Sequence, residues 1–115
     1  MIRQIALWFA FLFIGCESLV DADQYIPGQP VEKDFAEFAE GFLTKHCVDC
    51  HSGDDPAGDL ALDVLGSVES SNADIWKSVW AQVTLKEMPP KEAEQPEVLA
   101  RLQFSDWIIG ELTRA

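Results

Sequence analysis

Basic residues and cysteines are scarce in this sequence. Its 115 residues include 8 Lys and Arg against 20 Asp and Glu, which gives a formal net charge of −12. This deficit of positive charge argues against binding to nucleic acid or anionic lipid through a basic surface. Three cysteines are too few for a disulfide scaffold, and a 48% hydrophobic composition is not that of a disordered chain. The length leaves room for one small domain.

Strand-like alternation of apolar and polar residues is also absent. Apolar residues at helical spacing instead predict three main helices, over residues 31–46, over residues 73–84, and from about Pro96 toward the end of the chain. Ser71 or Asn72 is suited to cap the second helix. The predicted apolar positions are Phe35, Phe38, Ala39, Phe42 and Leu43 in the first helix, Ile75, Trp76, Val79, Trp80 and Val83 in the second, and Leu99, Leu102, Trp107, Ile108 and Leu112 in the third. We therefore expect a small all-α domain with long loops.

The first 22 residues resemble an export signal. Arg3 precedes the apolar run from Ile5 to Ile14, whose ten residues are too few to span a bilayer. Cleavage after Ala22 would release the chain, whereas the stretch from Phe13 to Cys16 resembles a bacterial lipoprotein box and would leave a lipid on Cys16. A buried N-terminal helix is the third alternative. The expected layout is a signal over residues 1–22, a linker over 23–31 that is rich in proline, and a domain over 32–115.

Cys47-Val48-Asp49-Cys50-His51 matches the C-x-x-C-H pattern that attaches c-type haem. Two thiols three residues apart can form thioethers with the two vinyl groups on one haem edge, and His51 is then held under the iron as an axial ligand. Chance occurrence of this pattern is on the order of one in a thousand at this composition. We therefore predict one covalent haem c, bonded to Cys47 and Cys50. Export is consistent with this, since bacterial c-type haem is attached outside the cytoplasm.

Two alternatives use the same cysteines. A zinc site needs a fourth ligand, but the predicted domain has no third cysteine. His46 directly precedes Cys47, which is a poor geometry for two residues that share one metal. A dithiol redox motif expects a neighbouring βαβ pattern, which the sequence lacks. A plain local disulfide between Cys47 and Cys50 belongs with this second alternative.

Met88 is the leading candidate for the sixth iron position. Its thioether is a soft ligand, and His/Met ligation raises the reduction potential of a haem. Pro89 and Pro90 restrict the backbone that follows it. A methionine that fills a gap in the core is the alternative, and His46 is the alternative ligand, although it directly precedes Cys47 and fits the end of a helix better.

Several apolar residues are candidates for the wall of a haem pocket or for an ordinary core. In a domain this small the two roles overlap, because the haem would itself form much of the core. No carboxylate pair, catalytic triad, phosphate loop or dinucleotide motif is apparent, so no catalytic residue is predicted. The candidate wall residues are Phe42, Leu60, Leu62, Trp76 and Trp80.

Three blocks in this order resemble the planctomycete-type cytochrome c domain: residues 42–51 around the cysteines, the Gly-Asp-Leu-Ala-Leu-Asp stretch at 58–63 with Ile75-Trp76 after it, and Glu87-Met88-Pro89-Pro90. The resemblance spans residues from about 35 to 110. It implies a class I cytochrome c-like fold wrapped around one haem and a last helix packed against the first. It also implies Cys47 and Cys50 as covalent haem sites, His51 as proximal ligand and Met88 as distal ligand.

These observations predict an exported mono-haem c-type cytochrome, periplasmic or lipid-anchored, that transfers one electron at a time and is not an enzyme. Its partners would be redox proteins, including ones with a basic docking face, and a membrane would be met only through a lipid on Cys16. A haem enzyme or ligand sensor with an open sixth position is the second hypothesis. A structural zinc or dithiol module is the third.

Overall fold

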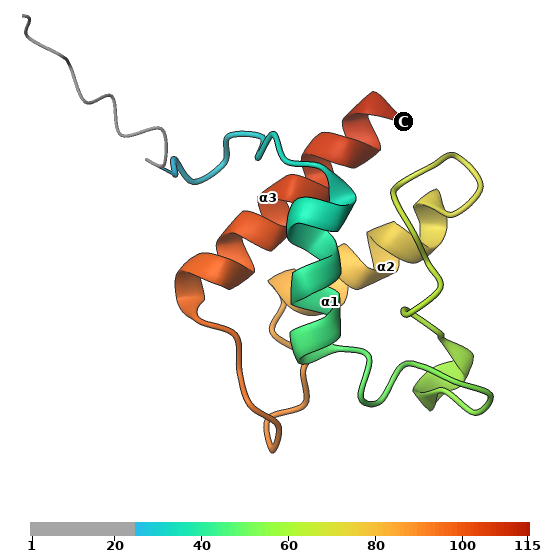
Figure 1. Ribbon diagram of the computed structural model, residues 1–115. Helices are drawn as coiled ribbons and strands as arrows, with labels where there is room; N and C mark the ends of the chain where they lie inside the picture. The colour runs from blue at the N-terminus through green and yellow to red at the C-terminus, as the bar shows by residue number, and fades with distance from the viewer. Residues whose placement is uncertain (1–24) are drawn as a thin grey trace, which may run out of the picture.

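The computed structural model of the chain describes residues 25–115 and contains three α-helices (Figure 1). Helix α1 spans Glu40–His46, α2 spans Ala73–Thr84 and α3 spans Val98–Arg114. A π-helical turn, η1 (Phe35–Ala39), leads directly into α1, and a 3-10 turn, η2 (Ala57–Asp59), lies in the loop after it. Residues 25–115 contain no strand, so the all-α class is confirmed for this part of the chain. The export signal predicted for residues 1–22 lies outside the described residues.

The first helical segment begins at Phe35, later than the predicted start at residue 31. Asp34 is the reason, because its backbone is extended and its side chain accepts a hydrogen bond from the Glu37 amide at 2.8 Å. This is a standard way to begin a helix, since it satisfies a donor of the first turn. The carbonyl of Lys33 is engaged elsewhere and accepts a hydrogen bond from Trp107 Nε1 at 2.7 Å.

Helix α2 has the predicted bounds, but the predicted side-chain cap is wrong. Asn72 occupies the N-cap position without a capping hydrogen bond. Its amide is used by the preceding loop: Nδ2 donates to Leu65 O at 3.1 Å and to Ser67 O at 2.9 Å, and Oδ1 accepts from the Glu69 amide at 2.8 Å. Asn72 therefore closes the loop between α1 and α2 instead of capping the helix.

Helix α3 buries Trp107 and Ile108 as predicted, and Leu112 packs against the core, but the first half of the helix differs from the prediction. Leu99 and Leu102 are 53% and 43% exposed, whereas Arg101 is only 8% exposed and Phe104 is fully buried. The hydrophobic pattern could not reveal this half of the face, because an arginine occupies one of its buried positions. The guanidinium is tolerated there because protein oxygens satisfy its donors.

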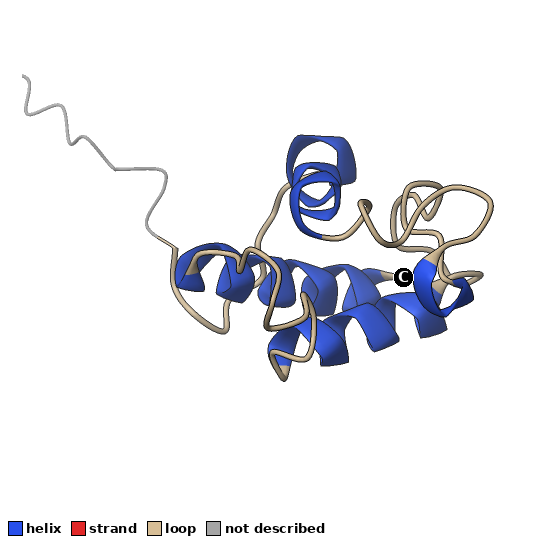
Figure 2. Ribbon diagram, turned by 90° about the horizontal axis from the view of Figure 1, so that it is seen from below, coloured by secondary structure: helices blue, strands red, loops and turns tan. Residues whose placement is uncertain are grey.

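Helices α2 and α3 lie side by side, and α1 crosses them on one side (Figures 1 and 2). An aromatic cluster joins the three helices. The Phe42 ring of α1 stacks on Phe104 of α3 with 3.9 Å between centroids, and Trp76 of α2 meets Trp107 of α3 edge-on at 5.5 Å. Close packing of this kind fixes the relative positions of the helices. The buried apolar residues are Ala39, Phe42, Leu43, Leu62, Trp76, Val79, Val83, Phe104, Trp107 and Ile108.

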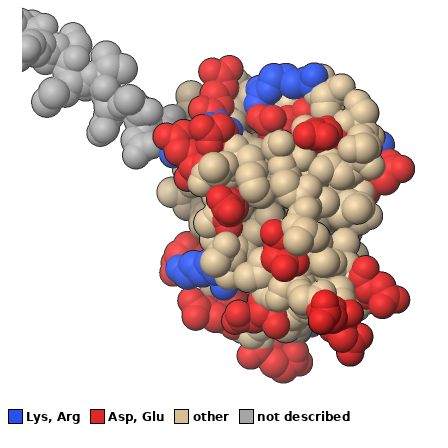
Figure 3. All heavy atoms as spheres, turned by 45° about the vertical axis from the view of Figure 1, so that its right-hand side comes forward, with Lys and Arg blue, Asp and Glu red and all other residues tan. Residues whose placement is uncertain are grey.

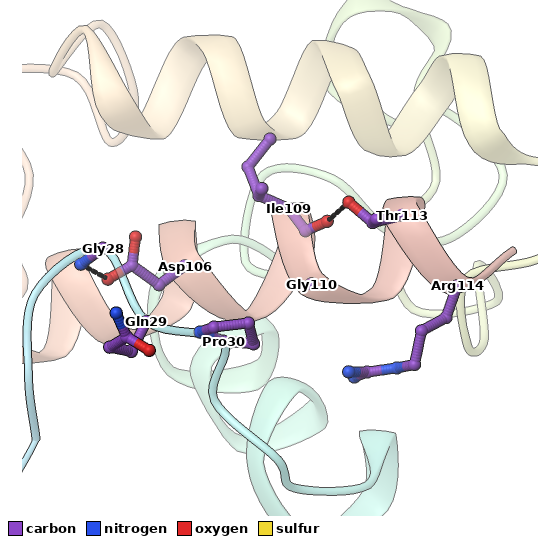
Figure 4. Close-up of a pocket in the computed structure, with 8 residues that line it drawn as sticks. All are labelled: Gly28, Gln29, Pro30, Asp106, Ile109, Gly110, Thr113 and Arg114. Carbon is purple, nitrogen blue, oxygen red and sulfur yellow. Dashed lines mark hydrogen bonds between the residues drawn. The ribbon is translucent and has the colours of Figure 1, made fainter.

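Residues 25–34, here called the N-terminal strap, run along α3. Tyr25 Oη donates to Asp106 Oδ2 at 2.5 Å, and the Gly28 amide donates to the same oxygen at 2.8 Å (Figure 4). Pro30 lies against Gly110, where a Cβ would come within 3.3 Å of the proline Cβ. The helix continues past this glycine to Arg114, and its lack of a side chain admits the strap. The strap includes the described part of the predicted linker and is in contact with the domain.

A shallow pocket lies where the strap crosses α3 (Figure 4). It contains none of the four residues predicted to bind haem. Its lining residues are Gly28, Gln29, Pro30, Asp106, Ile109, Gly110, Thr113 and Arg114.

Replacing Asp106 by Ala is expected to release the strap. Partial burial and the hydrogen bond to Asp106 raise the pKa of Tyr25 to about 12 from its ordinary value of 10.0. In the variant this pKa falls toward 10, and the loss of two partly exposed hydrogen bonds lowers the free energy of unfolding by about 1 kcal/mol. In the parent protein the Tyr25 phenol donates the hydrogen bond and must stay protonated to do so. The stabilisation that this bond gives is therefore complete below pH 10 and is lost as the pH rises toward 12.

Ultraviolet titration measures this pKa directly, because the chain has one tyrosine. Asp74→Ala is the control, since Asp74 pairs only with Lys77 on the surface. A tyrosine pKa that stays near 12 in Asp106→Ala would contradict the contact.

Candidate haem attachment site

The two candidate haem cysteines lie on a turn that continues from the end of α1. The Cys47 and Val48 amides both donate to Leu43 O, at 2.9 and 3.0 Å. The His51 amide then donates to Cys47 O at 3.0 Å, and the Cys50 amide to the same oxygen at 3.2 Å. These bonds bring Cys47, Cys50 and His51 into one compact turn, as the C-x-x-C-H spacing predicts.

His51 is oriented by the loop that follows. Its Nδ1 lies 3.2 Å from Leu60 O, and its own carbonyl accepts from the Leu62 amide at 2.7 Å. A carbonyl oxygen can only accept, so Nδ1 carries the hydrogen in this bond and Nε2 keeps the lone pair that binds a metal. Metal-ligating histidines are commonly held this way, with the second nitrogen donating to a backbone carbonyl.

The two thiols differ in their surroundings. Cys50 is exposed, whereas Cys47 is half-buried, and burial raises the pKa of the Cys47 thiol to about 11. Cys47 and Cys50 form no disulfide with each other. The local-disulfide alternative therefore has no support in this conformation.

Met88 lies on the turn that leaves α2 and is 37% exposed. Its amide and that of Glu87 both donate to Gln82 O, at 3.1 and 2.9 Å, while Lys86 takes a positive φ of 60°. This pattern is a common way to end a helix, because it satisfies a carbonyl of the last turn. The Met88 carbonyl accepts from Arg101 Nη1 at 2.8 Å.

The sequence did not indicate any role for Arg101 or for Gln95, which also holds this loop. Gln95 Nε2 donates to the carbonyls of Pro89 and Pro90, at 3.3 and 2.8 Å. The available signal was a basic residue among the apolar positions of the last helix. That signal is weak, because such a residue usually extends into solvent.

His46, the alternative sixth ligand, lies at the end of α1 with its ring 4.8 Å from that of Phe42. Burial, together with the nearby charge of Lys45, lowers the pKa of His46; Glu94 opposes this shift and Arg101 adds to it. These charges show that the end of α1 is close to the loop that carries Met88 and to Arg101. Whether His46 or Met88 ligates the iron stays a prediction.

The residues of the turn fit a c-type haem in their donor set, because two cysteines and a histidine with an oriented ring are the groups that such a haem uses. In the core, Trp76 Nε1 is buried and has no hydrogen-bond partner within residues 25–115, which is unusual for a buried donor.

The candidate wall residues divide into two groups. Phe42, Leu62 and Trp76 are buried in the protein core, as their helical spacing also predicts. Leu60 and Trp80 are only partly buried and pack against that core, so they retain surface that a bound porphyrin would cover. Among residues 25–115, no group of three or more His, Cys, Asp or Glu side chains is placed to hold a metal ion.

The haem-free protein is expected to react with iodoacetamide first at Cys50. At pH 8 the rise in the pKa of Cys47 from its ordinary value of 9.0 to about 11 lowers its thiolate content about a hundredfold. The greater nucleophilicity of its thiolate offsets part of this difference, so Cys47 should be modified about tenfold more slowly. Peptide mapping by mass spectrometry follows each cysteine separately. In 6 M guanidinium chloride, as a control, the two rates should converge. Equal rates in the folded protein would contradict the difference in burial.

A family model described as Planctomycete cytochrome C matches residues 47–92, a segment that begins at Cys47 and includes His51 and Met88. No curated protein and no solved structure matches the chain. None of the helices within residues 25–115 has the length and apolar character needed to cross a membrane. The match supports the resemblance found in the sequence: residues 47–92 are similar to the planctomycete cytochrome c family, whose domain implies a haem c cofactor and is consistent with an electron carrier.

Proposed function

We propose that this protein is an exported mono-haem c-type cytochrome that transfers single electrons. The observation that carries the proposal is the turn from Cys47 to His51, whose backbone hydrogen bonds place both cysteines beside a histidine with an oriented ring. The family match over residues 47–92 supports the same cofactor. When bound, the haem iron supplies the one-electron redox chemistry.

The protein residues attach, orient and enclose the cofactor. Cys47 and Cys50 hold it through thioethers, and His51 ligates the iron through Nε2. The hydrogen bond from Nδ1 to Leu60 O fixes the ring and makes it a better electron donor to the iron. Met88 would supply the second protein ligand of the iron, and its thioether would favour a high reduction potential. With both positions occupied by side chains, no substrate reaches the iron, so the protein acts as a carrier and has no catalytic residue.

The surface supports docking to partners of opposite charge. On the face in Figure 3, acidic side chains are spread over the surface and are densest along its lower edge, and few Lys or Arg are present. Acidic surfaces steer basic partners over about a Debye length, so electron transfer with a basic redox protein is expected to slow as salt is added. Redox proteins of this kind are the proposed partners.

Residues 1–22 support export. In this proposal the mature protein is either released after Ala22 or anchored through a lipid on Cys16, and these two forms place it in the periplasm or on a membrane. Residues 23–31 then link the export signal to the domain over residues 32–115.

A haem enzyme or ligand sensor is the second candidate function. One observation favours it: the Met88 side chain is 37% exposed and is not enclosed by the core. If Met88 does not bind the iron, carbon monoxide would bind readily to the isolated reduced protein.

Mass spectrometry of protein made with the haem maturation machinery is the first test. The expected product is one haem retained after denaturation, together with an N-terminus that begins at Asp23 or at a lipidated Cys16. Cys47→Ser and Cys50→Ser should each retain the haem less completely, because one thioether is lost. A protein that carries no haem after denaturation would refute the proposal.

Met88→Ala is the second test. The variant is expected to have an altered visible spectrum, a lower reduction potential and at least about tenfold tighter binding of imidazole, because removal of the thioether vacates an axial position. Leu85→Ala is the matched control, since Leu85 is an exposed apolar residue in the same turn. If Met88→Ala resembles this control, Met88 is not a ligand and the open-site candidate is favoured.

A further inference from the structure

Arg101 is a buried cation that is held by neutral oxygens. It is 8% exposed, and within residues 25–115 no carboxylate pairs with it. Nη1 donates to Val83 O at 2.9 Å and to Met88 O at 2.8 Å, while Nη2 donates to Gln95 Oε1 at 2.9 Å. Burying a charge is unfavourable unless its donors are satisfied. The guanidinium is therefore tied to these three acceptors, and it fixes them in turn.

Gln95 extends this arrangement to the loop that follows Met88. While its Oε1 accepts from Arg101, its Nε2 lies within 3.3 Å of the carbonyls of Pro89, Pro90 and Ala93. Proline has no amide hydrogen, so Pro89 and Pro90 cannot hold the loop by donating bonds of their own. Their carbonyls are secured by Gln95, and Gln95 is secured by Arg101.

Met88 is consequently held on both sides of its backbone. Its amide donates to Gln82 O at the end of α2, and its carbonyl accepts from Arg101 on α3. Its side chain, at 37% exposed, is not fixed by core packing in the same way. The position from which the thioether extends is therefore set by backbone hydrogen bonds, and the bond to Arg101 is the one that connects it to α3.

We propose that Arg101, together with Gln95, is a positioning residue for the sixth iron ligand. By fixing the Met88 backbone, Arg101 keeps the thioether in the axial position and determines how readily another ligand displaces it. The inference rests on the proposed His51/Met88 ligation and extends it to residues of this chain that lie beyond the matched segment 47–92.

The physical basis is preorganisation. A foreign ligand binds only to the fraction of molecules in which Met88 has left the iron, so its apparent affinity rises in proportion to that fraction. Removal of a hydrogen bond between a charged donor and the loop makes this opening more favourable. A loss of this kind is expected to raise the open fraction about tenfold.

The test is imidazole binding to the oxidised haem-bearing protein, in which the sulfur–iron bond breaks and a nitrogen–iron bond forms. Arg101→Gln should bind imidazole about tenfold more tightly and weaken the absorption band due to sulfur ligation of ferric iron. Gln95→Ala should also tighten imidazole binding and weaken this absorption band, but by a smaller amount. Arg101→Lys should fall between the parent and Arg101→Gln, because an ammonium can still donate to the Val83 and Met88 carbonyls.

Arg114→Gln is the matched control. Arg114 lies on the same helix, but it is exposed and pairs with Glu111. The same substitution there should leave imidazole affinity and the sulfur band unchanged. Circular dichroism establishes that each variant is folded, and if Arg101→Gln does not fold, Arg101→Lys and Gln95→Ala decide the question.

A second comparison separates positioning from a general loosening of the fold. In a Met88→Ala background, Arg101→Gln should not tighten imidazole binding further, because there is no thioether left to position. Equal tightening with and without Met88 would overturn the inference.

The outcomes also separate this inference from the proposed function. A parent protein that retains haem but lacks the sulfur band refutes Met88 ligation, and with it the role of Arg101. A parent protein with the band, in which Arg101→Gln behaves like Arg114→Gln, overturns the positioning role alone and leaves the proposed function intact.

Discussion

The stack of Phe42 on Phe104 determines where the attachment turn lies. Its rings are 3.9 Å apart, and it joins α1 to α3 directly. Because α1 ends only four residues after Phe42, any movement of this contact would move Cys47 and the turn that carries His51. The seven residues of α1 are too few to form a stable helix alone, so tertiary contacts must hold it. The position of Cys47, Cys50 and His51, the residues predicted to attach the haem, therefore depends on packing against α3.

Helix α3 holds the other parts of the domain as well, through a series of side chains along its length. Arg101 secures the Met88 loop, Phe104 secures α1, Asp106 secures the strap, and Trp107 donates to the carbonyl of Lys33. The family match ends at residue 92, before α3 begins. The matched segment thus carries the residues predicted to bind haem, while the helix that positions them lies outside it.

The sequence predicted what depends on local spacing and failed where distant groups meet. Helix α2 has regular apolar spacing, and its bounds were predicted correctly. The C-x-x-C-H motif is likewise a local pattern, and its role in haem attachment stays a prediction. Asn72 was predicted to cap α2 because its side chain suits that position, but loop carbonyls compete for the same amide. On α3 the burial of Trp107 and Ile108 was predicted correctly, but that of Leu99 and Leu102 was not, because hydrophobicity cannot indicate that Arg101 is buried. Such a residue becomes buried only when the fold supplies carbonyls, here from Val83 and Met88.

The groups that hold Arg101 are neutral oxygens, although the chain is rich in acidic residues. The chain has 20 acidic and 8 basic residues, so a carboxylate partner for Arg101 would have been easy to supply in sequence terms. The ion pairs within residues 25–115, Lys77 with Asp74 and Arg114 with Glu111, instead lie on the surface between residues one helical turn apart. A buried carboxylate would add its own desolvation cost and would attract the guanidinium away from the loop. Carbonyl and amide oxygens add no second buried charge. Because they belong to the loop itself or to the end of α2, the guanidinium that binds them holds the loop in place. The Met88 loop is thus restrained by its main chain, which leaves the thioether available as a ligand.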